Sequence, residues 1–263
     1  MRNKGLSLLA VILISGASAR AEVKTKAVSY EYDGVKLKGH LAWDDAVKGK
    51  RPGVLLVHEW WGLNDYARTR ADQLAKLGYV AFACDMYGEG KHTEHPREAA
   101  QFAGEVRKNV EVWRGRAQAG LKVLKDQEQV DANRLAAIGY CFGGSTALQL
   151  AYTGADLKAV VTFHAALPVA DAEQAKAIKA KILICHGAAD KFVPEESAVK
   201  FRAALESAKV DYAMVYLGNA THSFSVKGID DKKVPGLSYN AEADHRSWKY
   251  MRELFDEVFE AKK

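Results

Sequence analysis

Six short, continuously apolar segments constrain the fold of this chain more than any other feature. They lie at residues 53–58, 80–84, 135–140, 159–163, 182–185 and 212–216, and segments with helical spacing separate most of them. Continuous apolar runs of this length are typical of strands buried on both faces, as in a parallel sheet. Their alternation with helices predicts an α/β fold, in which helices cover both faces of a mostly parallel sheet.

The rest of the pattern predicts a sheet of about eight strands in a single domain. Asp33-Gly34 lies between two extended segments and is a strong hairpin signal, which adds a pair of strands near the N-terminus. Helices are expected at residues 64–77, 96–126 in two pieces, 144–152 and 195–208, with a final helix capped by Asn240. No internal repeat or linker interrupts the sequence, so residues 22–263 are expected to form one domain.

The first 21 residues have the pattern of a secretory signal peptide. Arg2 and Lys4 precede a short apolar run, and Ala19-Arg20-Ala21 forms a cleavage site before Glu22. Cleavage after Ala19 is a second possibility. The alternative to cleavage is a retained membrane anchor, although the apolar run is short for a membrane span. We therefore expect a periplasmic or secreted protein that does not bind the membrane after cleavage.

Charge and cysteine content narrow the partners of the mature chain. Most of the formal net charge of +5 comes from three basic residues within the signal segment, so little attraction to nucleic acid remains. Three cysteines leave at least one thiol unpaired in an oxidising compartment. Cys84 and Cys185 lie in predicted strands, where we expect buried small hydrophobic residues. A thiol-redox protein that uses Cys141 is an alternative, but the sequence has no C-x-x-C motif.

The third cysteine lies in a motif that predicts a nucleophile. Gly139-Tyr140-Cys141-Phe142-Gly143 stands between a predicted strand and a predicted helix, in the pattern G-x-nucleophile-x-G. Small flanking residues allow the sharp turn that such a motif needs, and the helix N-terminus favours a thiolate. A glycine-rich turn with a buried cysteine is the alternative interpretation.

Two further residues complete a candidate triad. Asp190 follows the predicted strand that ends at Cys185, and His222 follows the next predicted strand. By count, Cys141, Asp190 and His222 come after the fifth, seventh and eighth strands, in the order of α/β-hydrolase triads. Loops beyond the carboxyl ends of parallel strands share one edge of the sheet, so the three side chains are expected to meet there.

At this point the sequence resembles the dienelactone hydrolase family of α/β-hydrolases, over nearly all of the predicted mature chain. The blocks that carry the resemblance are Val57-His58-Glu59-Trp60-Trp61-Gly62-Leu63-Asn64, Asp85-Met86-Tyr87-Gly88, Gly139-Tyr140-Cys141-Phe142-Gly143-Gly144, His186-Gly187 with Asp190, and His222-Ser223-Phe224. The resemblance implies that Cys141, Asp190 and His222 are the triad. It also implies that Glu59 pairs with the resting Cys141, and that the backbone N–H groups of Trp60 and Phe142 form the oxyanion hole. A surface carboxylate is the alternative for Glu59.

Two positions depart from the family pattern, if the resemblance is used to locate the family's arginines in this sequence. Glu89 and Val226 occupy the positions where family members that take dienelactones carry arginines for the substrate carboxylate. Lys91, Arg97 or Lys227 could substitute for them. Candidate pocket residues are Trp61, Tyr87, Glu89 and His164, with ordinary packing as the alternative for Trp61 and a core histidine as that for His164.

The sequence therefore predicts a hydrolase that cleaves a carboxylic ester or lactone through a Cys141 thioester. A thioesterase, or a protein that binds a small molecule without catalysis on the same scaffold, are the alternatives. No cofactor or metal is expected, because His92 and His95 lie in a polar loop without a third ligand pattern nearby.

Overall fold

The computed structural model describes residues 22–260 of the chain, and its central feature is one eight-stranded sheet. The strands run in the order β1-β2-β4-β3-β5-β6-β7-β8 across the sheet. The six strands from β4 to β8 in this order are parallel, while β2 joins β4 in antiparallel register and β1 pairs with β2 as a hairpin. The predicted α/β-hydrolase architecture is therefore confirmed.

The elements follow the alternation that the apolar runs predict. The strands are β1 (Val23–Tyr32), β2 (Val35–Asp44), β3 (Arg51–Val57), β4 (Val80–Cys84), β5 (Val130–Tyr140), β6 (Ala159–Phe163), β7 (Lys181–Gly187) and β8 (Tyr212–Leu217). The helices are α1 (Asp65–Lys76), α2 (Pro96–Arg107), α3 (Val110–Lys125), α4 (Phe142–Ala151), α5 (Ala172–Ala177), α6 (Glu195–Ser207) and α7 (Ala241–Phe259), with a short 3-10 helix η1 (Ile229–Lys232).

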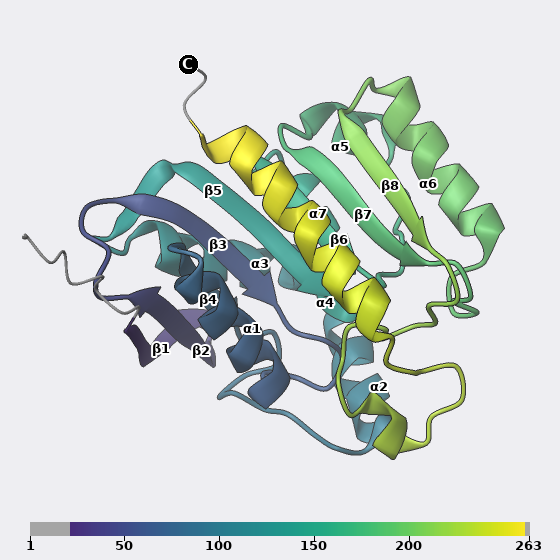
Figure 1. Cartoon of the computed structure of the whole chain (residues 1–263), viewed down its shortest axis with the longest axis horizontal. Helices are drawn as coiled ribbons and strands as arrows, with labels where there is room; N and C mark the ends of the chain where they lie inside the picture. Colours follow the sequence, from purple (N-terminus) through teal and green to yellow (C-terminus); the bar gives the residue numbers. More distant parts are fainter. Residues whose placement is uncertain (1–21, 261–263) are drawn as a thin grey trace, which may run out of the picture.

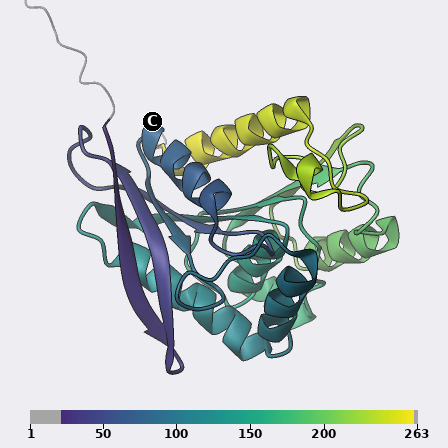
Figure 2. The same ribbon diagram turned by 90° about the horizontal axis from the view of Figure 1, so that it is seen from below.

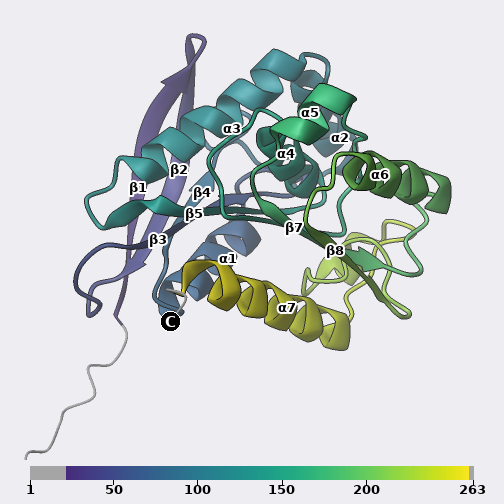
Figure 3. The ribbon, with the colours of Figure 1, turned by 90° about the horizontal axis from the view of Figure 1, so that it is seen from above.

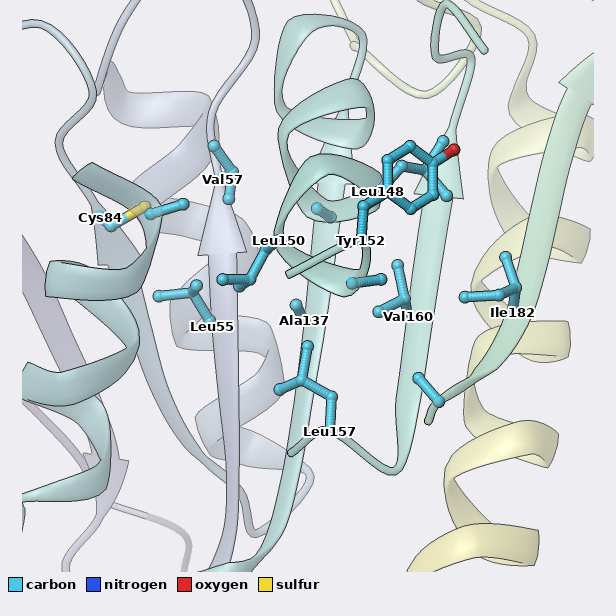
Figure 4. Packing of buried hydrophobic residues seen from close by; sticks show 14 of the residues in the cluster. Leu55, Val57, Cys84, Ala137, Leu148, Leu150, Tyr152, Leu157, Val160 and Ile182 are labelled. Atoms are coloured by element: carbon cyan, nitrogen blue, oxygen red, sulfur yellow. The ribbon is translucent and has the colours of Figure 1, made fainter. Parts of the chain in front are cut away.

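Helices cover both faces of the sheet. Figure 1 labels the helices, and Figure 3 shows that α1 and α7 lie on one face of the sheet and α2 to α6 on the other. The packing of the second face is seen in Figure 4, where Leu55 and Val57 of β3 and Val160 of β6 meet Leu148 and Leu150 of α4. All five side chains are fully buried. The hairpin β1–β2 stands at one side of the sheet, away from α7 (Figure 2).

The local signals explain where several helices begin. Asn64 accepts a hydrogen bond from the N–H of Ala67 and so begins α1, and Asn240 does the same for Ala243 at the start of α7. On α7, Met251 and Phe255 lie four residues apart and are both buried, so they share the face that packs on the sheet.

Some boundaries differ from those expected. The hairpin strand β1 begins at Val23, and β5 begins at Val130 because its first residues pair with β3 beside Arg51. Helix α5 was not expected from the sequence, although Asp171 and Gln174 form a capping box at its start. The short helix η1 was not expected either.

The predicted signal peptide lies outside the described residues. Within residues 22–260, no helix combines the length and the apolarity that crossing a membrane requires.

Candidate active site

The predicted nucleophile, acid and base follow β5, β7 and β8, and their loops meet at the carboxyl edge of the sheet. Cys141 comes directly after β5, Asp190 lies three residues beyond β7, and His222 lies five residues beyond β8. All three strands run parallel, so these loops emerge on the same side.

Close backbone approach around Cys141 explains the glycines of its motif. A Cβ atom on Gly139 would lie 2.0 Å from the carbonyl oxygen of Gly143, and one on Gly143 would lie 2.1 Å from that of Val57. These contacts press α4 against β5 and β3. Cys141 is forced to φ 52° and ψ −112°, which side chains rarely adopt, and it precedes the first residue of α4. Such strain at a turn before a helix is typical of a nucleophile elbow.

His222 and Asp190 form a buried, hydrogen-bonded pair. Nδ1 of His222 lies 2.8 Å from Oδ2 of Asp190, and both side chains are almost fully buried. The other oxygen of Asp190 accepts a hydrogen bond of 2.8 Å from the N–H of Phe192, which fixes the carboxylate. Burial lowers the pKa of His222, but the nearby Cys141 thiol and Asp190 outweigh burial and raise that pKa well above its usual value. The ring is therefore disposed to hold a proton beside the thiol.

Two backbone N–H groups beside Cys141 are free to bind an oxyanion. Within residues 22–260, neither the N–H of Trp60 nor that of Phe142 donates a backbone hydrogen bond. The carbonyl of Trp60 accepts a hydrogen bond of 3.0 Å from Tyr87 Oη, which holds this loop. The ring of Phe142 is fully buried and packs 5.6 Å from Tyr87, so the second N–H is also on a rigid segment.

Glu59 is buried at the site, but it does not pair with Cys141. It is 2% exposed, and its Oε1 accepts a hydrogen bond of 2.8 Å from Ser223 Oγ. No hydrogen bond joins it to Cys141 in the described part of the chain, so this arrangement differs from the pairing implied by the family resemblance. The alternative of a surface carboxylate is also wrong. Burial raises the pKa of Glu59 to about 7, and the hydrogen bond from Ser223 opposes that shift.

The raised pKa predicts that Glu59→Gln stabilises the fold at alkaline pH. An unfolded glutamate ionises near its ordinary value of 4.5, whereas the folded carboxyl ionises near 7. Burial of the charge therefore costs nothing below pH 4.5, costs more as the pH rises to 7, and costs the full amount above 7. Each pKa unit is worth 1.36 kcal/mol, so the full cost is at most about 3 kcal/mol. We expect Glu59→Gln to raise the free energy of unfolding at pH 8 and to leave it nearly unchanged at pH 4.

Urea denaturation at the two pH values measures this effect. Glu128→Gln is the matched control, since Glu128 is exposed and its removal should not change stability differently at pH 4 and pH 8. A gain for Glu59→Gln of equal size at both pH values would show that the buried charge is not its cause.

Trp61 and Tyr87, two of the candidate pocket residues, lie in the packed surroundings of the triad. Trp61 is 2% exposed and packs 4.8 Å from the ring of Trp60 and against Val226. Tyr87 is also buried and holds the Trp60 loop, as described above. Val226 thus belongs to an apolar cluster, so this position does not supply the positive charge of the family's arginine.

Glu89 does not face the triad, and its assignment to the pocket is wrong. Its backbone has φ 52°, and its N–H donates to the carbonyl of Lys36 at 2.9 Å. This bond ties the loop after β4 to the hairpin. The exposed side chain then lines a groove beside Tyr30, Lys36 and Lys38, on the hairpin. The place of Glu89 in the sequence, two residues after Tyr87, gave no indication of this turn.

His164 lies at the end of β6 and is fully buried. Its ring packs edge-on against that of His222, with the ring centres 5.4 Å apart. Burial lowers its pKa well below the usual range, and the neighbouring His222 adds to this effect. It is therefore a neutral core histidine that packs directly against the ring of His222.

Sequence reasoning missed a cavity of about 270 Å³ beside the elbow. Ser145, in the first turn of α4, and Phe192, whose ring lies 5.2 Å from His222, connect this cavity to the triad. Its remaining lining residues are Arg107, Trp113, Ala166, Leu167, Pro168, Val193, Pro194 and Ser197. Most of these side chains are apolar, and the exposed guanidinium of Arg107 lies 5.1 Å from the ring of Phe142. The nearness of Phe192 to Asp190 in the sequence was the one available signal.

The other two cysteines lie away from this site. Cys84 and Cys185 are fully buried and free, and burial raises the pKa of each thiol. They lie on β4 and β7, which are not neighbours in the sheet. The expectation of buried hydrophobic cysteines is confirmed. Among residues 22–260, no group of three or more histidine, cysteine, aspartate or glutamate side chains is arranged to hold a metal ion.

Comparison with known proteins agrees with this arrangement. Residues 37–259 match the profile of the dienelactone hydrolase family. Protein usf from Aquifex pyrophilus is 29% identical over 219 residues, which are 81% of this chain and 93% of that protein.

Solved structures give the same result. The structure named m3DLH is 42% identical, with a TM-score of 0.88 over 90% of this chain and 99% of its own. A dienelactone hydrolase-like promiscuous phosphotriesterase from metagenomic libraries is 40% identical, with the same TM-score and coverage. The family profile spans most of the chain, and the sheet places the family's motifs at one edge. The chain therefore belongs to the dienelactone hydrolase family of carboxylic ester hydrolases.

Proposed function

We propose that this protein hydrolyses a carboxylic ester or lactone through a Cys141 nucleophile and a thioester acyl-enzyme. The observation that carries this proposal is the hydrogen bond of 2.8 Å between His222 Nδ1 and Asp190 Oδ2, beside a cysteine at a strained turn. With Nδ1 engaged, Nε2 is the nitrogen left to exchange a proton with the thiol.

The first half of the reaction acylates the cysteine. His222 Nε2 takes the proton of the Cys141 thiol, and the thiolate attacks the substrate carbonyl carbon. The carbonyl oxygen becomes an oxyanion, which the N–H groups of Trp60 and Phe142 are placed to bind. The bond from the carbonyl carbon to the ester oxygen then breaks, and His222 returns its proton to that oxygen.

The second half releases the acid. His222 takes a proton from a water molecule, whose oxygen attacks the thioester carbonyl. The sulfur leaves as a thiolate and takes back the proton that His222 holds, and the acyl group departs as a carboxylic acid. Asp190 stabilises the imidazolium in both halves, since it lies at the opposite nitrogen.

Trapping the acyl group tests the proposal directly. The protein is mixed with activated esters that have bulky acyl groups, quenched with acid during turnover, and digested for mass spectrometry. We expect the acyl mass on the peptide that contains Cys141, and its release by hydroxylamine. Cys185→Ala is the matched control, because it removes a buried thiol and should still be acylated at Cys141. Turnover with no adduct on that peptide would contradict a covalent cysteine mechanism.

The same panel of substrates separates the alternatives. Faster turnover of acyl thioesters than of oxygen esters and lactones would favour a thioesterase. A phosphotriester belongs in the panel, because one relative of 40% identity is named for that activity. Tight binding of a small molecule without turnover of any ester would favour a binding protein on this scaffold.

A further inference from the structure

A buried chain of polar side chains runs from α7 to Glu59. Asp244 of α7 forms an ion pair with the guanidinium of Arg70 on α1. Arg70 Nε donates to Tyr66 Oη at 3.2 Å, and Tyr66 Oη lies 2.8 Å from Ser225 Oγ. Ser225 Oγ in turn lies 2.8 Å from His164 Nε2. The chain connects elements that lie far apart in the sequence, and neither the triad nor the oxyanion hole accounts for it.

The guanidinium sets the direction of these hydrogen bonds. Arginine only donates, so Tyr66 Oη accepts from Arg70, and its single proton is left for Ser225 Oγ. When Ser225 Oγ accepts from Tyr66, its own single proton is left for His164 Nε2, which then accepts. Arg70 Nη2 also donates to the carbonyl of Ser225 at 2.8 Å and so fixes the position of this serine.

A neutral imidazole that accepts at Nε2 carries its proton at Nδ1. Within the described residues, Nδ1 of His164 has no hydrogen-bond partner, although it is fully buried. It lies 3.7 Å from Oε1 of Glu59, which is too long for a hydrogen bond but places the N–H dipole against the carboxylate. The same Oε1 accepts the hydrogen bond from Ser223.

We propose that the hydrogen-bond chain from Arg70 through Tyr66 and Ser225 fixes His164 as its Nδ1–H tautomer, and that His164 is thereby a positioning residue that favours ionised Glu59. The opposite tautomer would aim a lone pair at the carboxylate and would favour its protonated form. The effect on turnover rests on the proposed function, whereas the tautomer itself does not.

Several other groups act on this pair, and all of them except Tyr66 are the same in the wild type and in every variant. The charged and titratable groups around His164 and Glu59 are His222, Arg70, His186, Tyr66 and Tyr87. Burial above all, and then the neighbouring His222, Arg70 and His186, lower the pKa of His164, so its ring is neutral and carries one proton.

The tautomer is measured by NMR on the full chain with ¹⁵N-labelled histidine. Nitrogen shifts show which ring nitrogen carries the proton, and the resonance missing from His164→Gln identifies His164. We expect a protonated Nδ1 in the wild type and at least partial transfer of the proton to Nε2 in Ser225→Ala. A second variant, Tyr66→Phe, interrupts the hydrogen-bond chain one step before Ser225. Tyr30→Phe is its matched control, because Tyr30 Oη donates instead to the carbonyl of Asp85, on the hairpin side. A proton on Nε2 in the wild type, or an unchanged tautomer in Ser225→Ala, would overturn the proposal.

The pH profile of kcat/KM tests the effect on Glu59. The inflection that Glu59→Gln removes belongs to Glu59. We expect Ser225→Ala to move this inflection to higher pH by roughly one unit, and Tyr66→Phe to move it in the same direction, because the ionised carboxylate loses a favourable dipole. Ser225→Thr keeps the hydroxyl and should restore the wild-type position. A lasting inflection at the wild-type pH in Ser225→Ala would overturn the link to Glu59.

The two proposals fail in different ways. If no acyl group is found on Cys141, the proposed function fails, yet the tautomer of His164 can still be measured. If acylation occurs but His164 carries its proton on Nε2, only the hydrogen-bond chain is refuted.

Discussion

Replacing Cys141 with alanine should abolish ester hydrolysis while the fold stays intact. In the proposed mechanism Cys141 forms the covalent bond, so its loss removes the whole acylation path. Loss of the nucleophile in a hydrolytic triad lowers kcat by roughly 10⁴-fold or more. Initial rates on the best ester of the panel measure the effect, with circular dichroism as the test of folding.

Cys141→Gly is the control for this substitution. It also lacks the thiol, but glycine adopts φ 52° without strain, whereas alanine retains the strain. We expect both variants to be equally inactive, and Cys141→Gly to be more stable than Cys141→Ala by about 1 kcal/mol or more. If Cys141→Ala kept more than about a hundredth of the wild-type activity, Cys141 would not be the nucleophile.

Asp190→Asn should lower kcat by roughly 10³-fold to 10⁴-fold, through the proton on His222. The N–H of Phe192 donates to Oδ1 of Asp190, so the amide oxygen of the variant would stay at Oδ1. The amide nitrogen would then face His222 Nδ1, which would have to accept a hydrogen bond. The ring proton would move to Nε2, where it blocks the transfer from Cys141.

Steady-state kinetics measure this loss, and the rate of Cys141 alkylation shows whether the sulfur has become less reactive. Asp171→Asn is the control, because Asp171 is an exposed carboxylate that caps α5 and lies outside the triad. Its activity should match the wild type. A decrease of less than tenfold in Asp190→Asn would mean that Asp190 does not orient the base.

The succession of strands along the chain and the meeting of the triad loops follow from the sequence, because parallel strands place their C-terminal loops on one side of the sheet. The prediction that Asp190 and His222 meet needed only the count of strands and their direction. The contact of Glu59 with Ser223 could not be predicted in this way, because it depends on the rotamers of two loops that are 164 residues apart. Glu89 was misplaced because its own backbone adopts a left-handed conformation, with φ 52°, which turns the loop toward the hairpin. A glutamate in the sequence does not indicate that conformation.

The polar chain behind His164 was also invisible in the sequence. Tyr66 and Arg70 are spaced as helix neighbours, which the sequence does indicate, but their partners come from the loop after β8 and from α7. Only the tertiary fold brings these four elements together. By contrast, α5 was missed although its capping residues were present, since six residues are too few for a clear helical period.

The strained turn at Cys141 separates the choice of nucleophile from the rest of the scaffold. Its shape is dictated by the contacts of Gly139 and Gly143, and no hydrogen bond of the Cys141 side chain caps the helix. Evolution can therefore exchange sulfur for oxygen at this one codon without rebuilding the sheet, the helix or the loop that carries the N–H group of Trp60. The enzyme's susceptibility to oxidants and its preference for a leaving group would then change by mutation at a single position, while the architecture is inherited unchanged.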